Sequence, residues 1–327
     1  MKLPRRKVLH LAAGAAAAMA VPRASFGESY PARQVRVVVP FAPGGPTDIF
    51  ARLIVQKLTE QFGKQFYVEN VGGASGSIGT AQVAKAQPDG YTVLFHVNSF
   101  AINPVFFDKV PYDPFKDFEF VTLAARNDVV FAVHPSVPAK TVAEFVAYAK
   151  AHDGRFTFCS GGTGSVTHLV GAQFALSVGL DVVHIPYSGA GPAVAAALAN
   201  HVPAVFSSAP PVVPHILEGR LRALAVTGKV RSPSLPSVPT MAEAGYPETK
   251  GDQWVGVFVP ARTPPDIVAA LQREVVKAVS SPDIKERFAA IGFVPVGSTP
   301  AEFEAVIRSD MESFSKVIKA GNLKPDG

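Results

Sequence analysis

The fold is decided by the stretch Val35-Arg36-Val37-Val38-Val39-Pro40-Phe41-Ala42-Pro43-Gly44-Gly45-Pro46-Thr47-Asp48. Its first five residues form an apolar run typical of a strand that is buried on both faces of a parallel sheet. A loop rich in glycine and proline follows, and then apolar residues recur at helical spacing until Gly63 ends the helix. Strand, glycine-rich loop and helix form the opening unit of an α/β fold.

The same unit recurs along the chain. Residues 65–69 predict a strand, 72–79 a glycine-rich loop, 80–86 a helix and 91–97 a third strand. Alternating strands and helices with short loops favour right-handed crossovers. We therefore expect a mainly parallel sheet that is covered by helices.

A second series of elements begins after a long extended segment at residues 120–133. A strand at 254–260 then precedes a tail of helices with one short strand, 293–296, which is too little for a third domain. The second series comprises helices at 141–151, 167–178 and 192–200, and strands at 155–159, 182–186, 204–207 and 221–227.

The chain length indicates two lobes, because 327 residues exceed what one compact core usually serves. We expect residues 28–124 with 254–327 to form the first lobe and 125–253 the second. Connections near 121–132 and 250–260 would join the lobes. A cleft would then lie where the loops at the carboxyl ends of the parallel strands meet.

Composition and charge exclude several classes of protein. Hydrophobic residues make up 48% and charged residues 17%, a balance that permits large cores and argues against a disordered chain. The formal charge of +5 lies in the first 27 residues, where five basic groups precede the first acidic residue, Glu28; the remaining 26 basic and 26 acidic groups cancel. No basic cluster interleaved with aromatic residues follows, so we expect no nucleic-acid partner.

Residues 1–27 resemble a secretory signal. A basic start precedes an apolar run from Val8 to Val21 that is too short to span a bilayer comfortably. Cleavage is expected after Ala20 or Gly27. Adjacent Arg5 and Arg6 leave open whether export uses the Sec or the twin-arginine route. No later segment has the length and apolarity of a membrane span.

Cysteine and histidine usage predicts neither disulfide nor metal. Cys159 is the only cysteine, and its position at the end of an apolar strand favours a buried small hydrophobe over a reactive thiol. The histidines that could serve as ligands lack the paired spacing of a metal site, and we expect no metal or cofactor. They are His168, His184, His201 and His215.

The loop from Phe41 to Asp48 is the first candidate for ligand binding. Glycines stand directly before a helix start, so unpaired backbone N–H groups and the positive end of the helix dipole would face the cleft. Gly44 and Gly45 allow a ligand to approach the backbone, and Thr47 or Asp48 can cap the helix. An anion site is predicted, although a tight capped turn without a ligand has the same pattern.

Two further loops lead from a strand into a helix. Ser160-Gly161-Gly162-Thr163-Gly164-Ser165 offers hydroxyls beside N–H groups, but it lacks the Gly-Lys-Ser/Thr ending of a nucleotide-binding loop. His168 could reach a ligand or satisfy a carbonyl. In Pro186-Tyr187-Ser188-Gly189-Ala190-Gly191, Tyr187 could stack on a ligand or pack in the core. The loop from Phe41 to Asp48 and the loop from Ser160 to Ser165 would accept anions from opposite lobes, which would suit a ligand with two carboxylates.

The candidate binding residues come from these loops and from two more strand ends. They are Phe41, Pro43, Gly44, Gly45, Thr47, Asp48, Asn98, Ser99, Ser160, Thr163, Gly164, Ser165, His168, Tyr187, Ser188, Gly189 and Ser207.

A hydrolase is the remote alternative. Ser160 or Ser165 with His168 and Asp48 could be arranged as a triad. The Gly-x-Ser-x-Gly elbow is absent, and no second residue that would orient the histidine is evident. We therefore expect no enzymatic activity.

Taken together, the motifs resemble the Bug-type receptors of tripartite tricarboxylate transporters. The match covers nearly the whole chain after the leader, and the order of its pieces is specific. The pieces are Val38 to Asp48, Gly72-Gly73-Ala74-Ser75-Gly76, Pro88-Asp89-Gly90-Tyr91-Thr92, Gly162 to Ser165 with His168, Pro186 to Gly189, and Pro239-Thr240-Met241-Ala242-Glu243-Ala244-Gly245.

This resemblance implies a type II periplasmic-binding-protein fold, with two α/β lobes that close like a flytrap on a small organic anion. It also implies a periplasmic, monomeric receptor that delivers a carboxylate to membrane permease subunits, or reports it to a sensor kinase. Dicarboxylates, tricarboxylates, acidic amino acids and aromatic acids all stay open. One departure is at Phe206-Ser207-Ser208, where relatives frequently carry an aspartate.

Overall fold

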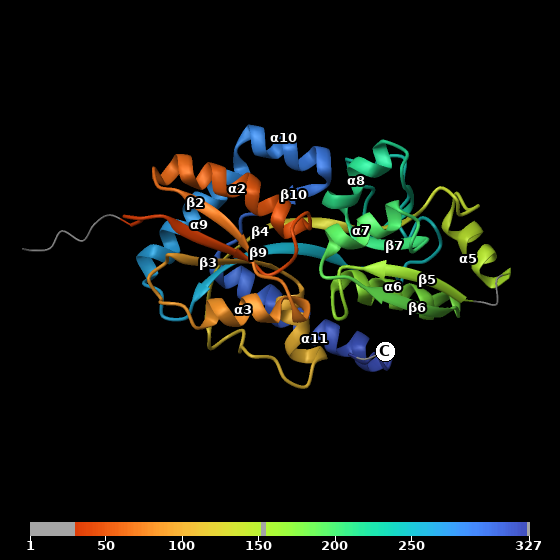
Figure 1. Cartoon of the computed structure of the whole chain (residues 1–327), viewed down its shortest axis with the longest axis horizontal. Helices are drawn as coiled ribbons and strands as arrows, with labels where there is room; N and C mark the ends of the chain where they lie inside the picture. Colours follow the sequence, from red (N-terminus) through yellow and green to blue (C-terminus); the bar gives the residue numbers. More distant parts are fainter. Residues whose placement is uncertain (1–29, 152–154, 326–327) are drawn as a thin grey trace, which may run out of the picture. The chain divides into compact units, whose positions relative to one another are not determined.

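The computed structural model describes residues 30–151 and 155–325 (Figure 1). The predicted leader and its cleavage sites lie outside the described residues. No helix in the described ranges has the length and apolarity needed to cross a membrane.

The first group of elements is built on three parallel strands. β1 (Val35–Val39) pairs with β2 (Phe66–Asn70) on one side and β3 (Thr92–Val97) on the other. Each strand leads into a helix. These helices are α2 (Pro46–Phe62), α3 (Ser77–Ala84), which follows the short 3-10 turn at Ala74–Gly76, and α4 (Ser99–Phe106).

The second group repeats this arrangement. β5 (Arg155–Ser160) runs parallel to β6 (Asp181–Pro186) and to β7 (Ala204–Ser208). The helices of this group are α5 (Val142–Ala151), α6 (Val166–Val178), α7 (Ala190–Leu198) and α8 (Ala209–Leu217).

Two long strands that run antiparallel to each other join these sets. β4 (Phe118–Val133) and β9 (Asp252–Pro260) lie side by side (Figure 1). β9 also runs antiparallel to β3, and β4 runs antiparallel to β7. β4 and β9 pair as far as Asp128 of β4. From Val129 onward β4 pairs instead with β7 and with β8 (Arg222–Val226). The sheet is therefore mixed, and the expected parallel pairing holds only within each group.

The tail returns to the first group of elements. α9 (Pro265–Ser280) packs on α2 and β4, and α11 (Pro300–Ala320) packs on α4 and β4. α10 (Pro282–Ile291) contacts both α9 and α8, and β10 (Phe293–Pro295) pairs with β4.

Aromatic side chains fill separate cores in the two groups. Phe100 stacks on Phe258 with ring centroids 4.1 Å apart, and Phe131 stacks on Phe206 at 4.5 Å. All four rings are fully buried. Burial of each contributes about 1.5 to 3 kcal/mol, so these cores hold the strands that carry the loops described below.

Cys159 is fully buried, as expected. Its thiol donates to the carbonyls of Ala193 and Ala204, and burial raises the pKa of the thiol to about 12. The thiolate, which is the reactive form, is therefore strongly disfavoured.

Candidate functional site

A narrow cavity lies where three helices begin. α2 starts after Gly45, α6 after Ser165 and α7 after Gly189, and all three of these residues line the cavity. No side chain caps α2 or α7, so their first N–H groups remain available. The positive ends of three helix dipoles therefore converge on one space, which is an arrangement suited to an anion.

Three polar side chains in this cavity have no hydrogen-bond partner among the described residues. They are the Thr47 hydroxyl, the Ser99 hydroxyl and the Gln253 carbonyl oxygen. The three residues are at most 5% exposed. Because a buried polar group without a partner costs about 1–3 kcal/mol, a ligand that pairs with these groups would recover that cost.

The cavity is bounded by loops that touch each other. The Ala42 N–H donates to the Ser188 carbonyl over 3.3 Å, and the Ser75 hydroxyl donates to the Thr163 carbonyl over 2.6 Å. The volume between the loops is about 30 Å³. This space admits a water molecule or two but no larger solute, so a ligand enters only if the loops separate.

A second cavity of about 230 Å³ adjoins the first and shares Phe41 and Gly161 with it. Thr163, Tyr187 and Ser188 line this second cavity, together with residues 73–76. No residue that lines either cavity carries a formal charge. Neutral donors would therefore hold an anion here.

The sequence-predicted residues divide into three sets by position. Phe41, Gly45, Thr47, Ser99, Ser165 and Gly189 line the first cavity, and Thr163, Tyr187 and Ser188 line the second. The others line neither cavity: Pro43, Gly44, Asp48, Asn98, Ser160, Gly164, His168 and Ser207. Direct ligand contact stays a prediction for every residue.

Asp48 faces into the protein and holds its own loop. Its carboxylate accepts from the Gly44 N–H, the Arg52 guanidinium and the Asn70 amide, each at 3.0 Å. Burial of Asp48 would raise the pKa of its carboxyl, but these hydrogen bonds outweigh burial and lower it. Gly44 has φ of 82°, which favours glycine at this turn.

The residues of the hypothetical triad do not come together. His168 stacks on His184 with ring centroids 4.1 Å apart, and its Nδ1 accepts from the Gly164 N–H. The Ser160 hydroxyl lies 2.7 Å from Nε2 of His184, while the Ser165 hydroxyl accepts from the His168 N–H. Burial lowers the pKa of His168 to about 4 and that of His184 to about 3, so both rings are neutral.

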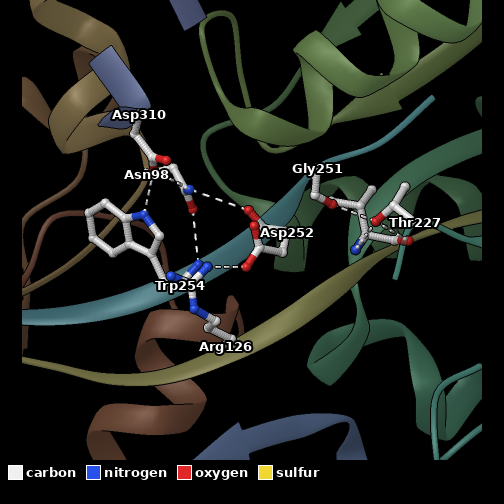
Figure 2. A network of polar contacts seen from close by, with 8 residues as sticks. Asn98, Arg126, Thr227, Gly251, Asp252, Trp254 and Asp310 are labelled. Atoms are coloured by element: carbon white, nitrogen blue, oxygen red, sulfur yellow. Dashed lines mark hydrogen bonds and ion pairs between the residues drawn. The ribbon is translucent and has the colours of Figure 1, made fainter. Parts of the chain in front are cut away.

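Asn98 ties together the elements beside the cavity (Figure 2). Its carbonyl oxygen accepts from the Trp254 N–H, and its amide donates to Asp310 and to the Asp252 carbonyl. Asp310 also accepts from the Trp254 indole over 2.7 Å. These bonds join the end of β3 to β9 and α11, so Asn98 positions Ser99 at the start of α4.

At the expected departure from the family pattern, the Ser207 hydroxyl donates to the Ser208 carbonyl. Both serines are fully buried, and neither lines the first or the second cavity.

Gln253 is the main lining residue that sequence reasoning missed. It lies on β9 directly before Trp254, where the predicted strand began. A polar amide at the start of an otherwise apolar strand was the available signal. The other lining residues absent from the candidate list are Pro46, Val97, Gly161, Val166, Thr167 and Ala190 in the first cavity and Gly73, Ala74, Ser75, Gly76, Gly162 and Pro186 in the second. Of these, Pro46, Gly161, Gly162, Pro186 and Ala190 belong to the loops that were predicted to bind.

This fold, with helix starts from two groups of strands around one cavity, defines a solute-binding protein of the periplasmic-binding-protein class. The chain belongs to the tripartite tricarboxylate transporter family of receptors, whose model matches residues 50–323. The resemblance to Bug-type receptors and the expected fold class are thereby confirmed.

Three solved structures are similar to this chain over most of its length. The periplasmic binding protein BugD is 31% identical, with a TM-score of 0.87 over 90% of this chain and 99% of its own. Rpa4515 of R. palustris, solved with adipate, is 33% identical, with a TM-score of 0.87 over 90% and 99%. MatC of Rhodopseudomonas palustris, solved with malate, is 32% identical, with a TM-score of 0.83 over 88% and 100%.

Proposed function

We propose that this chain is an exported receptor that closes over a small carboxylate, most readily a dicarboxylate, without transforming it. One observation carries the proposal. The N-termini of α2, α6 and α7 meet the unpartnered side chains of Thr47, Ser99 and Gln253 around one uncharged cavity. Such groups can bind a carboxylate, and among the described residues no base hydrogen-bonds to the Thr47 or Ser99 hydroxyl to activate it as a nucleophile.

Closure would move two lobes, residues 28–124 with 254–327 and residues 125–253. The change in β4 pairing between Asp128 and Val129 supports this division. The contacts between loops beside the first and second cavities support a closed arrangement. A ligand that contacts both lobes favours that arrangement by its difference in affinity for the two states.

The dicarboxylate class is supported by relatives and by the two adjoining cavities. Adipate in Rpa4515 and malate in MatC each carry two carboxylates. In this chain, one carboxylate would meet the helix starts around the first cavity. The other would lie toward the loops of the second cavity, at residues 73–76 and 161–163.

The receptor would act outside the cytoplasm as a monomer and deliver its ligand to the permease subunits of a tripartite tricarboxylate transporter. Family membership supports this partner. Asp48, Ser160 and His168 hydrogen-bond to Arg52, His184 and Gly164 respectively and not to one another, which supports binding without hydrolysis.

A thermal-shift screen tests the ligand class. The panel contains malate, adipate, citrate, glutamate and benzoate, with glucose and spermidine as controls. A ligand at a hundred times its Kd adds about 2.7 kcal/mol of stability, so a binder raises Tm by several degrees. Stabilisation by glucose or spermidine, with none by any acid, would refute the carboxylate proposal.

Replacing Thr47 with valine is expected to raise the Kd of the best acid about 10-fold or more, because a hydroxyl that can donate to a charged group is lost. Isothermal titration calorimetry measures this change. Thr157→Val on β5 is the matched control, since Thr157 lines neither cavity, and its Kd should equal that of the wild type. Equal affinities in both variants would place the ligand away from α2.

A further inference from the structure

A third hollow, which we call the junction cavity, lies beside the point where β4 changes its pairing partners. Its volume is about 910 Å³, which is the size of a small-molecule site. Residues 126–128 of β4, residues 292–295 around β10, and residues 227–230 with 232 and 233 after β8 line it. It shares no lining residue with the first or the second cavity.

Apolar side chains form much of the wall of the junction cavity. Phe293, Val230 and Val294 line it, and the two valines are 75% and 53% exposed. Exposed valines close together favour an apolar partner, because covering them removes apolar surface from water.

The charges around the junction cavity favour an anion. Lys229, Lys250 and Lys285 line it, and none of them forms an ion pair with a described residue. Of the two carboxylates that line it, Asp252 pairs with Arg126. Burial and the nearby Asp252 raise the pKa of Asp128 to about 6, so this carboxyl carries its charge only in part near that pH.

One buried amide in the lining lacks any partner. Asn127 is 2% exposed, and neither its side-chain nitrogen nor its side-chain oxygen has a hydrogen-bond partner among the described residues. Two unsatisfied buried atoms on one residue are costly, which indicates that a bound group completes their hydrogen bonding. In the β4–β9 register Asn127 stands opposite Gln253, which lines the first cavity.

We propose that the junction cavity is a second binding site, and that it takes an organic anion with an apolar chain, such as a medium-chain carboxylate. The three lysines face the carboxylate, Val230, Phe293 and Val294 cover the chain, and the Asn127 amide supplies a hydrogen bond.

Isothermal titration calorimetry with octanoate tests this site on the mature chain. The Lys229→Gln, Lys250→Gln, Lys285→Gln triple variant should bind octanoate about 10-fold more weakly, because three attractive charges are lost. These lysines are exposed, so the variant should fold. Asn127→Leu should also weaken binding about 10-fold, without lowering Tm, because it removes an unpaired polar group. Lys64→Gln, an exposed lysine that lines no cavity, is the control.

Two comparisons separate the junction cavity from the first cavity. Gly45→Val places a side chain in the first cavity and should leave octanoate binding unchanged. Octylammonium has the same chain with the opposite charge and should not bind. The proposal is overturned if octanoate shows no binding at millimolar concentration, if the triple variant binds it as the wild type does, or if Gly45→Val abolishes its binding.

Discussion

Replacing Gly191 with alanine is expected to weaken binding of the first-cavity ligand about 10- to 100-fold, while the ligand-free protein becomes no less stable. A Cβ atom on Gly191 would lie 2.7 Å from the Pro43 carbonyl oxygen and 3.0 Å from the Gly44 carbonyl carbon. Both atoms belong to the backbone of the opposite loop, so neither can rotate away. The loops would have to stay apart, and the closed arrangement would be penalised.

The same substitution should favour the helix that contains it. Gly191 is the second residue of α7, where alanine is preferred over glycine by up to about 1 kcal/mol. Calorimetry gives the Kd and thermal unfolding gives the Tm of the ligand-free protein. A loss of affinity with an unchanged or raised Tm is the expected pair of results.

Ala195→Gly is the matched control, because Ala195 is an exposed residue of the same helix. It should lower Tm slightly and leave the Kd unchanged. Small-angle scattering adds a third readout, since the wild type should become more compact with ligand and Gly191→Ala should not. Full compaction and normal affinity in Gly191→Ala would contradict the role of this contact in closure.

Acidification is expected to destabilise the fold because two buried histidines and one half-buried histidine are held as neutral rings. Burial lowers the pKa of His96 to about 3, that of His168 to about 4 and that of His184 to about 3, from an ordinary value of 6.5. As the pH falls, the histidines of the unfolded chain therefore bind protons that those of the folded protein do not bind. The stability that each ring contributes is present above pH 6.5 and falls with pH, by about 2 kcal/mol at pH 5.

Two carboxyls act in the opposite direction, because burial raises the pKa of Asp310 as well as that of Asp128. The pKa of Asp128 is raised from 3.8 to about 6, mainly by burial, so its folded form gains a proton as the pH falls through 6. Near pH 5.5 the three histidines should together bind about three protons when the chain unfolds. Asp128 should release about one proton in the same step, which offsets part of this uptake. The free energy of unfolding should therefore still fall between pH 7 and pH 5.

Urea unfolding across pH 5 to 7.5 measures this slope. His168→Asn should reduce the slope by about one proton, since the asparagine oxygen can still accept from the Gly164 N–H. Exposed His201 provides the control, and His201→Gln should leave the slope unchanged. A free energy of unfolding that stays constant or rises from pH 7 to pH 5 would show that the rings are protonated in the folded protein.

Much of the strand and helix order was predictable because it rests on local patterns. The apolar run at Val35–Val39 and the extended segment that forms β4 each have a sequence pattern typical of a strand. α4 and α8 were not predicted. Both segments resemble loops in sequence because they contain prolines: Pro104 in α4, and Pro210, Pro211 and Pro214 in α8. Proline is nevertheless tolerated in the first turn of a helix, where Pro210 and Pro211 lie.

The candidate site was predictable as a set of loops but not as a set of side-chain directions. Asp48 and Thr47 are adjacent, yet Thr47 lines the cavity while Asp48 turns toward Arg52 and Asn70. Asn70 comes from a neighbouring strand, so spacing along the chain cannot reveal this partner. Gln253 reaches the cavity because β9 lies between β3 and β4, and that pairing is long-range.

The buried state of Cys159 has a practical consequence for watching the receptor work. Because this thiol is the chain's only one and is shielded inside a core, maleimide dyes should ignore the unmodified protein. Cysteines introduced at exposed Glu60 in α2 and Lys150 in α5 would then be the sole labelling sites. Energy transfer between two such dyes would report opening and closing one molecule at a time.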